Sequence, residues 1–419
     1  MKIKLTPEMN VYMPFTQFCE RSKAMETICK THNLCTGCTA CENICPKQCI
    51  EMKVDEEGFK YPFINHNKCI NCEICKETCP VNNSSSKYGV LAGYVARYKD
   101  IDTVIESTSG GSFSAFANYT FSRDGLLYGV GYNERMVVRH FGIDKSQRSR
   151  VSEMIGSKYV QSELGDTFSE LKRALVDGKF VCFSGTPCQV AGLKAFLKKD
   201  YDNLLTVDLV CHGVASPLFF ERYVSYMQNK GNLKITNIKF RNKTYGYHSG
   251  TMMVEYENGK KYYGSGRVDY MSMAYFKGTC SRYSCYKCPF KGIERVSDFT
   301  VFDSWHVDKL VPSLKDDDKG FTNIFVRTEK GLHVIEEMKT HLEMHAADVD
   351  QMRLLDGVMI DKQPEMDSNR DTLIKQVEEN GFETALKCIY PISRRDYILE
   401  KCKRIIYKAG LMKVVKGQW

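Results

Sequence analysis

Two runs of closely spaced cysteines are the residues of this chain best suited to redox chemistry. The first run is Cys35, Cys38, Cys41 and Cys45, and the second is Cys69, Cys72, Cys75 and Cys79. Each has the pattern C-x2-C-x2-C-x3-C-P, which binds paired [4Fe–4S] clusters, and the fourth cysteine of each run serves the other cluster. The sequence therefore predicts one cluster on Cys35, Cys38, Cys41 and Cys79, and a second on Cys69, Cys72, Cys75 and Cys45.

Zinc is the alternative metal for such thiols, but zinc ribbons use two separated cysteine pairs rather than four closely spaced thiols. The spacing favours a small two-cluster ferredoxin-like domain over residues 34–83. A short extension, residues 1–33, precedes it and contains Cys19 and Cys29, which we interpret as spare thiols. The polar, turn-rich stretch 81–87 predicts a linker to a second domain.

Beyond the linker, strand and helix patterns alternate, as in an α/β domain. Cys188 lies at a predicted strand-to-helix turn, and Cys211 ends the next predicted strand. In a parallel sheet both side chains point into the crevice at the carboxyl ends of the strands. With the tight pair Cys285 and Cys288 they would make a third four-thiolate site. From the residues alone, a zinc site, a redox dithiol and ordinary buried cysteines stay open.

Several short strings in this region occur together in one order. They are Ser109-Gly110-Gly111, Gly156-Ser157-Lys158-Tyr159, Gly185-Thr186-Pro187-Cys188-Gln189, Cys211-His212-Gly213, Phe240-Arg241-Asn242-Lys243, Cys285-Tyr286-Lys287-Cys288 and Ser297-Asp298-Phe299-Thr300. Over about 88–306 the chain resembles the beta subunit of coenzyme F420 hydrogenase/dehydrogenase, with a ferredoxin module fused in front. The resemblance implies a domain over 88–345 with FAD and one [4Fe–4S] cluster. By position its ligands are Cys188, Cys211, Cys285 and Cys288, with Cys280 as a replacement or a neighbour.

Candidate flavin contacts follow from the chemistry of anion sites. Ser109, Gly110 and Gly111 open a predicted helix, whose backbone donors suit a pyrophosphate; the alternative is a simple capping loop. Lys158 would pair with a phosphate or a flavin carbonyl; the alternative is a solvated loop lysine. Arg241 would meet an anionic substrate; the alternative is an arginine at a strand edge. His212 is a candidate proton carrier or a structural residue.

One departure from the resemblance concerns pocket shape. The chain has Phe302-Asp303 where similar proteins often have Gly-Asp. A phenylalanine there would fill space that backbone or cofactor otherwise approaches closely.

Composition limits the partners. The 419 residues are 43% hydrophobic and carry a net charge of +8, with no export signal and no nucleic-acid motif. Nineteen cysteines without an export signal predict a reducing compartment, the cytoplasm. The chemistry of exposed low-potential clusters indicates in addition that this cytoplasm is anaerobic. Residues 346–419 are expected to be mainly helical and basic, either as a solvated helix on the domain or in peripheral contact with an anionic membrane.

The sequence thus predicts an α+β / α/β protein: a small ferredoxin-like domain, a larger mixed α/β flavin and iron–sulfur domain, and a helical tail. The leading hypothesis is a flavin-dependent iron–sulfur oxidoreductase that passes electrons between a two-electron carrier, such as coenzyme F420, and the ferredoxin clusters. Its partners would be a deazaflavin-type small molecule and a redox protein, either a ferredoxin or another oxidoreductase subunit. An electron-transfer subunit without substrate chemistry and a zinc-stapled scaffold are the alternatives.

Overall fold

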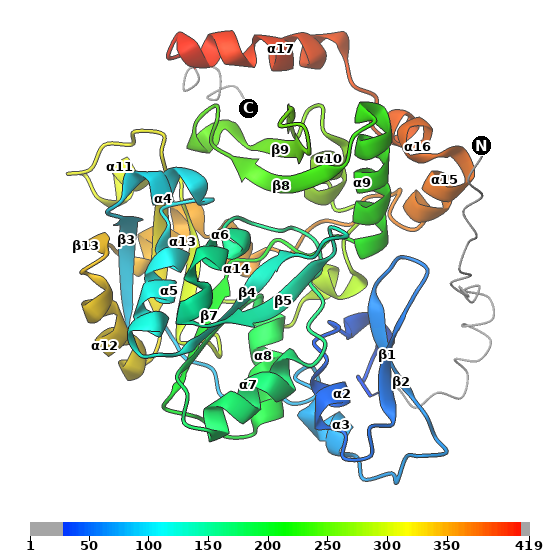
Figure 1. The fold of residues 1–419 in the computed structure, drawn as a ribbon, viewed down its shortest axis with the longest axis vertical. Helices are drawn as coiled ribbons and strands as arrows, with labels where there is room; N and C mark the ends of the chain where they lie inside the picture. The colour runs from blue at the N-terminus through cyan, green and yellow to red at the C-terminus, as the bar shows by residue number, and fades with distance from the viewer. Residues whose placement is uncertain (1–27, 412–419) are drawn as a thin grey trace.

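The structure is a computed structural model that describes residues 28–411 and contains a small cysteine-rich module, a large mixed sheet, a smaller antiparallel sheet and C-terminal helices (Figure 1). This arrangement confirms the predicted fold class. Cys19 and most of the predicted N-terminal extension lie outside the described residues.

The cysteine-rich module is built from two short helices and a hairpin. The antiparallel strands β1 (Ile50–Val54) and β2 (Lys60–Ile64) join the two cysteine runs, and helices α2 (Ala40–Ile44) and α3 (Ile74–Thr78) carry cysteines from each run. A single turn of 3-10 helix, η2 (His32–Leu34), precedes the first run. So small a module has little apolar core of its own, and α2 packs against helices of the large domain.

The large sheet has the strand order β13-β3-β12-β11-β7-β6-β4-β5. Its central strands β11, β7, β6 and β4 are parallel, whereas the strands toward both edges are antiparallel. The bounds are β3 (Ala92–Tyr98), β4 (Leu126–Tyr132), β5 (Val138–Ile143), β6 (Val181–Gly185), β7 (Leu204–Leu209), β11 (Phe299–Ser304), β12 (Phe321–Val326) and β13 (Leu342–Ala346).

Two apolar cores cover the faces of this sheet. Alternate residues of β6 serve different cores, because successive strand side chains point to opposite faces: Cys182 packs with one core, Val181 and Phe183 with the other. Helices α5 (Ser112–Ser122) and α12 (Glu329–Met338) belong to the first core, and α7 (Thr167–Val176) and α8 (Pro187–Leu197) to the second. Short helices at the sheet margins are α4 (Ile101–Glu106), η3 (Lys145–Arg150), α6 (Val151–Met154), α11 (Val307–Leu310), α13 (Val349–Asp356) and α14 (Val358–Asp361).

The antiparallel sheet and most of the remaining helices share one apolar cluster. Its strands are β8 (Ile235–Asn242), β9 (Thr251–Tyr256) and β10 (Lys261–Ser265), beside the short η4 (Tyr247–Ser249). Its helices are α9 (Pro217–Gly231), α10 (Tyr270–Phe276), α15 (Leu373–Asn380) and α16 (Phe382–Ile389), with η5 (Tyr283–Lys287) leading away from α10.

The C-terminal region is helical, as expected, and ends in α17 (Arg394–Lys408), which lies at one extremity of the molecule (Figure 1). Ile398 and Ile405 are exposed on it, whereas Lys403 is buried against Ser249 and Thr251. The predicted boundary at 345/346 falls one residue before the end of β13, and Met352 and Ile360 beyond it pack back under the sheet. The domain boundaries and the membrane contact of the tail stay predictions. Within residues 28–411, no helix combines the length and apolarity that a bilayer crossing requires.

Candidate metal centres

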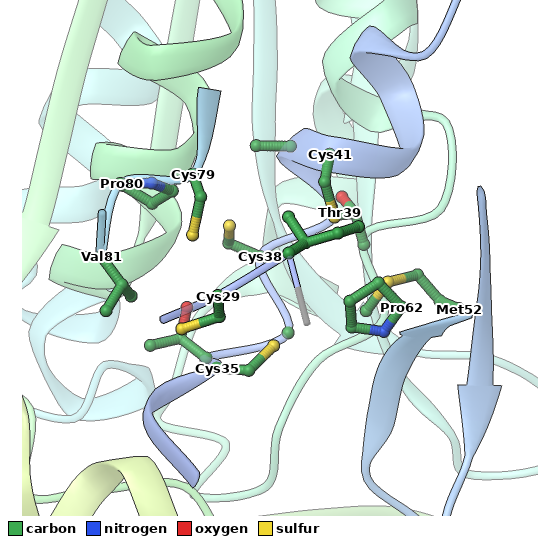
Figure 2. Close-up of a pocket in the computed structure, with 14 residues that line it drawn as sticks. Cys29, Cys35, Cys38, Thr39, Cys41, Met52, Pro62, Cys79, Pro80 and Val81 are labelled. Carbon is green, nitrogen blue, oxygen red and sulfur yellow. The ribbon is translucent and has the colours of Figure 1, made fainter. Parts of the chain in front are cut away.

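Three residues of the first run and the last residue of the second line one cavity in the cysteine-rich module. They are Cys35, Cys38, Cys41 and Cys79 (Figure 2). This is the grouping that the crossed assignment predicts. Cys29 lines the same cavity, is 3% exposed and hydrogen-bonds the Cys79 sulfur, which lowers the pKa of Cys79 to about 6. Cys29 is therefore part of the cavity wall rather than a thiol remote from the clusters.

A second cavity holds the other predicted quartet, Cys45, Cys69, Cys72 and Cys75. Here too a fifth cysteine is present: the Cys49 Sγ lies 3.4 Å from the Cys45 Sγ. Cys72 is exposed, and the neighbouring Ile70 is 57% exposed. Cys72 of the second quartet is therefore accessible to solvent, whereas Cys38, Cys41 and Cys79 of the first quartet are buried.

The two cysteine runs have the same backbone conformation. Thr39 and Glu73, each directly after the second cysteine of its run, have left-handed φ values of 60° and 59° and begin helices α2 and α3. Cys45 and Cys79 end these helices with φ −67° in both cases. The left-handed turn is costly for residues other than glycine. Its occurrence at equivalent positions shows that the motif repeats in three dimensions as well as in sequence.

The third cavity forms at the carboxyl ends of the parallel strands and is lined by Cys188, Cys211, Cys285 and Cys288. Cys188 is in the first turn of α8, which follows β6 and begins with Pro187 and a capping box between Thr186 and Gln189. Cys211 follows β7, which is parallel to β6. Cys285 and Cys288 come from η5 and its C-cap. The sheet thus brings together three separate segments of sequence, as the resemblance implies.

Cys280 does not line the third cavity. It is 3% exposed and packs in the apolar cluster of the antiparallel sheet, where its carbonyl accepts a hydrogen bond from Ser216 N. The geometry therefore favours Cys188 over Cys280 as the fourth cysteine.

The cysteine quartets enclose space rather than converge on a point. Among residues 28–411, no three His, Cys, Asp or Glu side chains are placed to hold a single metal ion. Each cavity is lined by four cysteines that could supply the four thiolates of a [4Fe–4S] cluster.

Burial keeps several of these thiols neutral. It raises the pKa of Cys38 to about 12, and the pKa of Cys285 likewise to about 12. Burial also raises the pKa of Cys211 to about 11, although Lys291 opposes this. Because metal ligation requires the thiolate, binding of iron would displace these protons.

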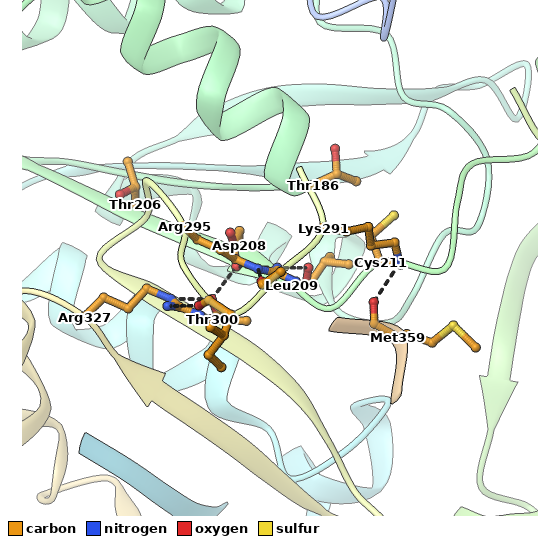
Figure 3. A network of polar contacts seen from close by, with 12 residues as sticks. Thr186, Thr206, Asp208, Leu209, Cys211, Lys291, Arg295, Thr300, Arg327 and Met359 are labelled. Carbon is orange, nitrogen blue, oxygen red and sulfur yellow. Dashed lines mark hydrogen bonds and ion pairs between the residues drawn. The ribbon is translucent and has the colours of Figure 1, made fainter. Parts of the chain in front are cut away.

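Three cations line the third cavity: Lys291, Arg282 and Arg295. Lys291 Nζ donates to the carbonyls of Cys211 and Met359 at 2.5 and 2.6 Å (Figure 3). Arg295 donates to Asp208 and to the Leu209 carbonyl, both at 3.1 Å. The third cavity is thus electropositive as well as thiol-lined.

The first and third cavities are neighbours across the module boundary. Thr36 lines both, and a Cβ on Gly192 of α8 would lie 2.9 Å from the Cys38 sulfur. The absent side chain at 192 lets the helix that begins beside Cys188 touch the first cavity.

Arg282 fastens this boundary. It is fully buried and donates to the carbonyls of Cys35 and Lys60 at 2.7 and 2.9 Å, and to Gln161 Oε1 at 2.9 Å. Its guanidinium also lies 4.1 Å from the centre of the Tyr61 ring. One side chain thereby links the ferredoxin-like module to the large domain.

The predicted flavin residues lie in one region, but two of them are occupied by protein contacts. Gly110 N donates to Thr322 Oγ1 at 2.8 Å, and a Cβ on Gly110 would lie 2.5 Å from the Ala96 carbonyl. Lys158 Nζ donates to the carbonyls of Glu153, Met154 and Ile155, and burial lowers its pKa to about 7. Gly110 therefore serves close backbone packing, and Lys158 satisfies carbonyls at the end of α6.

Arg241, Ser109 and Gly111 retain features of a ligand site. Arg241 is ion-paired with Asp303 at 2.6 Å and lies 4.5 Å from the centre of the Trp305 ring, while its buried Nη2 has no hydrogen-bond partner among the described residues. Gly111 is the left-handed N-cap of α5, and the first backbone N–H groups of a helix have no acceptor within the helix. Lys243 bridges to this loop by donating to the Ser109 carbonyl at 2.5 Å.

Phe302 and His212 have different surroundings. Phe302 packs with Phe325, Met352 and Ile360, whereas Asp303 faces Arg241 and Tyr247. The phenylalanine therefore does not fill the space beside Arg241. His212 lines the third cavity; its Nδ1 lies 3.3 Å from Met359 Sδ, and burial lowers its pKa.

Sequence reasoning missed Arg282, Lys291, Gly192 and the two fifth cysteines, Cys29 and Cys49. Their roles depend on which segments meet in space. The one local signal was Lys291, which lies three residues after Cys288 in the same loop.

Two known families match parts of this chain. Residues 178–352 match the C terminus of the coenzyme F420 hydrogenase/dehydrogenase beta subunit, and residues 34–83 match the 4Fe-4S dicluster domain. Among solved structures, a chain of the F420-reducing [NiFe] hydrogenase complex from Methanosarcina barkeri aligns with 18% identity over 70% of this chain and 94% of that chain, with a TM-score of 0.41. No curated protein matches the sequence.

Proposed function

We propose that this chain, which carries a 4Fe-4S dicluster domain and the C-terminal domain of a coenzyme F420 hydrogenase/dehydrogenase beta subunit, is a flavin-dependent oxidoreductase of the cytoplasm. It is an iron–sulfur electron-transfer protein by its family matches. The flavin, the third cluster and the substrate are the parts that we propose.

The observation that carries the proposal is the third cysteine quartet. Cys188, Cys211, Cys285 and Cys288 come from three segments and surround one cavity at the edge of the sheet where α/β folds bind ligands. We propose that they hold a [4Fe–4S] cluster. Thr186 Oγ1, 3.1 Å from the Cys188 sulfur, is placed to hydrogen-bond that ligand.

Contacts between the cavities suggest the order in which they exchange electrons. The third cavity adjoins the first through Thr36, Arg282 and α8. The first adjoins the second within the module, because each cysteine run contributes to both. We therefore propose the order third, first, second. The exposed second cavity would face the redox partner, a ferredoxin or another oxidoreductase subunit.

A flavin would supply the exchange between hydride and single-electron chemistry that iron–sulfur clusters lack. Arg241, Ser109 and Gly111 are the residues of this chain that we propose to hold it: the arginine through its unpartnered Nη2, and the loop through the first donors of α5. Lys158 and Gly110 would act indirectly, by fixing the backbone around them.

The chain supplies a contiguous aromatic path from this region to the third cavity. The rings of Tyr159 and Tyr275 stack with their centres 4.4 Å apart. Tyr275 Oη donates to the Gly213 carbonyl at 3.1 Å, two residues from Cys211. A flavin beside Arg241 would thus be connected to the third cluster through packed side chains.

The proposed substrate is a deazaflavin-type hydride carrier such as coenzyme F420. Support comes from the family match over residues 178–352 and from the cationic, aromatic surroundings of Arg241. An anionic, planar carrier would meet a guanidinium and the rings of Tyr247 and Trp305 there.

The proposal is tested by anaerobic purification of the whole chain, with iron, sulfide and flavin quantified. About twelve irons and one flavin per chain are expected from three cubanes and one FAD. A yellow-brown protein whose flavin bleaches with reduced coenzyme F420 supports the full proposal. About eight irons without flavin would contradict both the third cluster and the flavin.

A second candidate function is an electron-transfer subunit without substrate chemistry. The full use of Lys158 Nζ and Gly110 N by protein groups favours it. In that case the purified chain would hold about twelve irons but no flavin, and added FAD would remain unbound in equilibrium dialysis.

A further inference from the structure

The three cysteine cavities differ in the charges that line them. The first cavity is lined by no charged side chain among the described residues, and the second by one lysine and one glutamate, Lys47 and Glu73. The third is lined by Lys291, Arg282 and Arg295, with no carboxylate among its lining residues. Each cavity has four proposed thiolate ligands, so the cavities differ mainly in the charges around those ligands.

Two of the three cations, Lys291 and Arg282, form no direct ion pair with a carboxylate among the described residues. Arg295 is ion-paired with Asp208, which is itself held by Thr300 at 2.6 Å (Figure 3). Lys291 and Arg282 donate instead to neutral oxygens, those of backbone carbonyls and of the Gln161 amide. Within the described chain, the net charge lining this cavity is therefore positive.

All three cations are held by hydrogen bonds, and the two arginines are also shielded from water. Arg282 is fully buried and Arg295 is 3% exposed. Lys291 is half-buried and has two acceptors within 2.6 Å. Such charges are weakly screened and act strongly over short distances.

Reduction of a thiolate-ligated cluster adds one negative charge to a site that is already negative. Fixed cations nearby stabilise the reduced form more than the oxidised form, so they raise the reduction potential. No proton transfer or bond change is required.

We propose that Lys291 raises the reduction potential of the third centre above both ferredoxin-like centres, so that an electron on this chain resides preferentially at the third cavity. The inference rests on the proposed function, since it requires the third cluster. In this proposal Lys291 changes the reduction potential of the third cluster and does not contact a substrate.

The test is an EPR-monitored redox titration of the whole anaerobic protein. Cys188→Ala identifies the signal of the third cluster by removing it. In the unsubstituted chain that signal should appear at the highest midpoint potential of the three. Lys291→Met should lower this midpoint so that the one-electron equilibrium constant changes at least tenfold, which is about 59 mV, and should leave the other two unchanged.

Two further variants separate charge from packing. Lys291→Arg keeps the charge and should restore most of the midpoint. Lys287→Met removes an exposed lysine from the same loop, between Cys285 and Cys288 but outside the cavity lining, and should leave all three midpoints in place.

The inference would be overturned if the midpoint potential of the third cluster lay at or below those of the other two clusters, or if Lys291→Met left it unchanged. The protein would still contain three clusters in either case. An unsubstituted chain with only two cluster signals would overturn the inference together with the proposed function. These two failures are distinguished by the iron content.

Discussion

The ferredoxin-like module and the third cavity both bring cysteines together in sets of four, but the chain does so in two different ways. In the module, the eight motif cysteines lie within 45 residues of sequence, and the same left-handed turn appears twice, at Thr39 and Glu73. In the large domain, a sheet built from distant strands carries four cysteines to one edge and surrounds them with cations. The comparison teaches that spacing can specify a site's ligands, while tertiary structure specifies its electrostatics.

The largest effect should come from removing one ligand of the third cavity. We expect Cys188→Ala to lose about four of about twelve irons and to leave both ferredoxin-type EPR signals intact, because the module's quartets do not include it. Iron and sulfide analysis checks this. Cys280→Ala is the matched control, as Cys280 is buried nearby but outside the cavity, and it should keep all the iron. Loss of iron in the control alone would reverse the ligand assignment.

The next largest effect should come from removing the contacts of Arg282, which link the ferredoxin-like module to the large domain. Arg282→Met leaves the Cys35 and Lys60 carbonyls and Gln161 without their charged donor. We expect a loss of about 3–5 kcal/mol from the unfolding free energy, because these three acceptors lose their hydrogen bonds and each buried unsatisfied group costs about 1–3 kcal/mol. Denaturant unfolding of the anaerobic protein measures it.

The control for this prediction is Arg353→Met, which removes an exposed arginine ion-paired with Asp361 on the surface. It should cost less than about 1 kcal/mol. Equal losses in the two variants would show that Arg282 does not fasten the module.

A smaller effect is expected on the pH dependence of stability, which should depend on a histidine of the large domain and not on one of the ferredoxin-like module. Burial lowers the pKa of His140 to about 4, and this residue contacts Ser162 and Ser184 beneath the start of α8. Because its unfolded pKa is about 6.5, the unfolded chain binds more protons between these values, so stability is complete above pH 6.5 and falls as the pH falls. Between pH 7 and pH 5 we expect a loss of about 2 kcal/mol.

His140→Gln should remove most of this pH dependence, since glutamine cannot take up the proton. The exposed His66→Gln in the module should retain it. The comparison is made by denaturant unfolding at both pH values. An identical pH slope in His140→Gln and in the unsubstituted chain would contradict the prediction.

The smallest effect is expected at the fifth cysteine of the first cavity. Cys29→Ala should keep about twelve irons, because Cys35, Cys38, Cys41 and Cys79 complete the quartet. Cys79→Ala, in contrast, should lose a cluster. If instead Cys29→Ala loses iron and Cys79→Ala does not, Cys29 is the ligand and the crossed pattern is wrong.

Much of the fold is predictable because its signals are local. The strands β3, β4, β6 and β7 are short apolar runs between turn residues, and the proline before Cys188 marks the start of α8. The module's two quartets also follow from spacing alone. The structure brings the same cysteines together, while their ligation of iron stays a prediction.

The features that sequence could not predict depend on long-range contacts. The sequence suggests a phosphate contact for Lys158, but the carbonyls it satisfies belong to a helix end whose position is set by tertiary packing. Phe302 is expected from the sequence to narrow a pocket, yet strand alternation directs it to the opposite face from Asp303. Cys29 precedes the motif and approaches Cys79 only when the module folds.

The two cysteine runs have the same backbone conformation but differ in solvent exposure, and this difference affects how the protein should respond to air. Helix α8 and Arg282 shelter the first copy, whereas the loop around Ile70 and Cys72 leaves the second open to solvent. Oxygen should therefore damage the cluster of the second cavity first. A briefly aerated sample should lose electron transfer to its redox partner before it loses electron transfer between the first and third clusters.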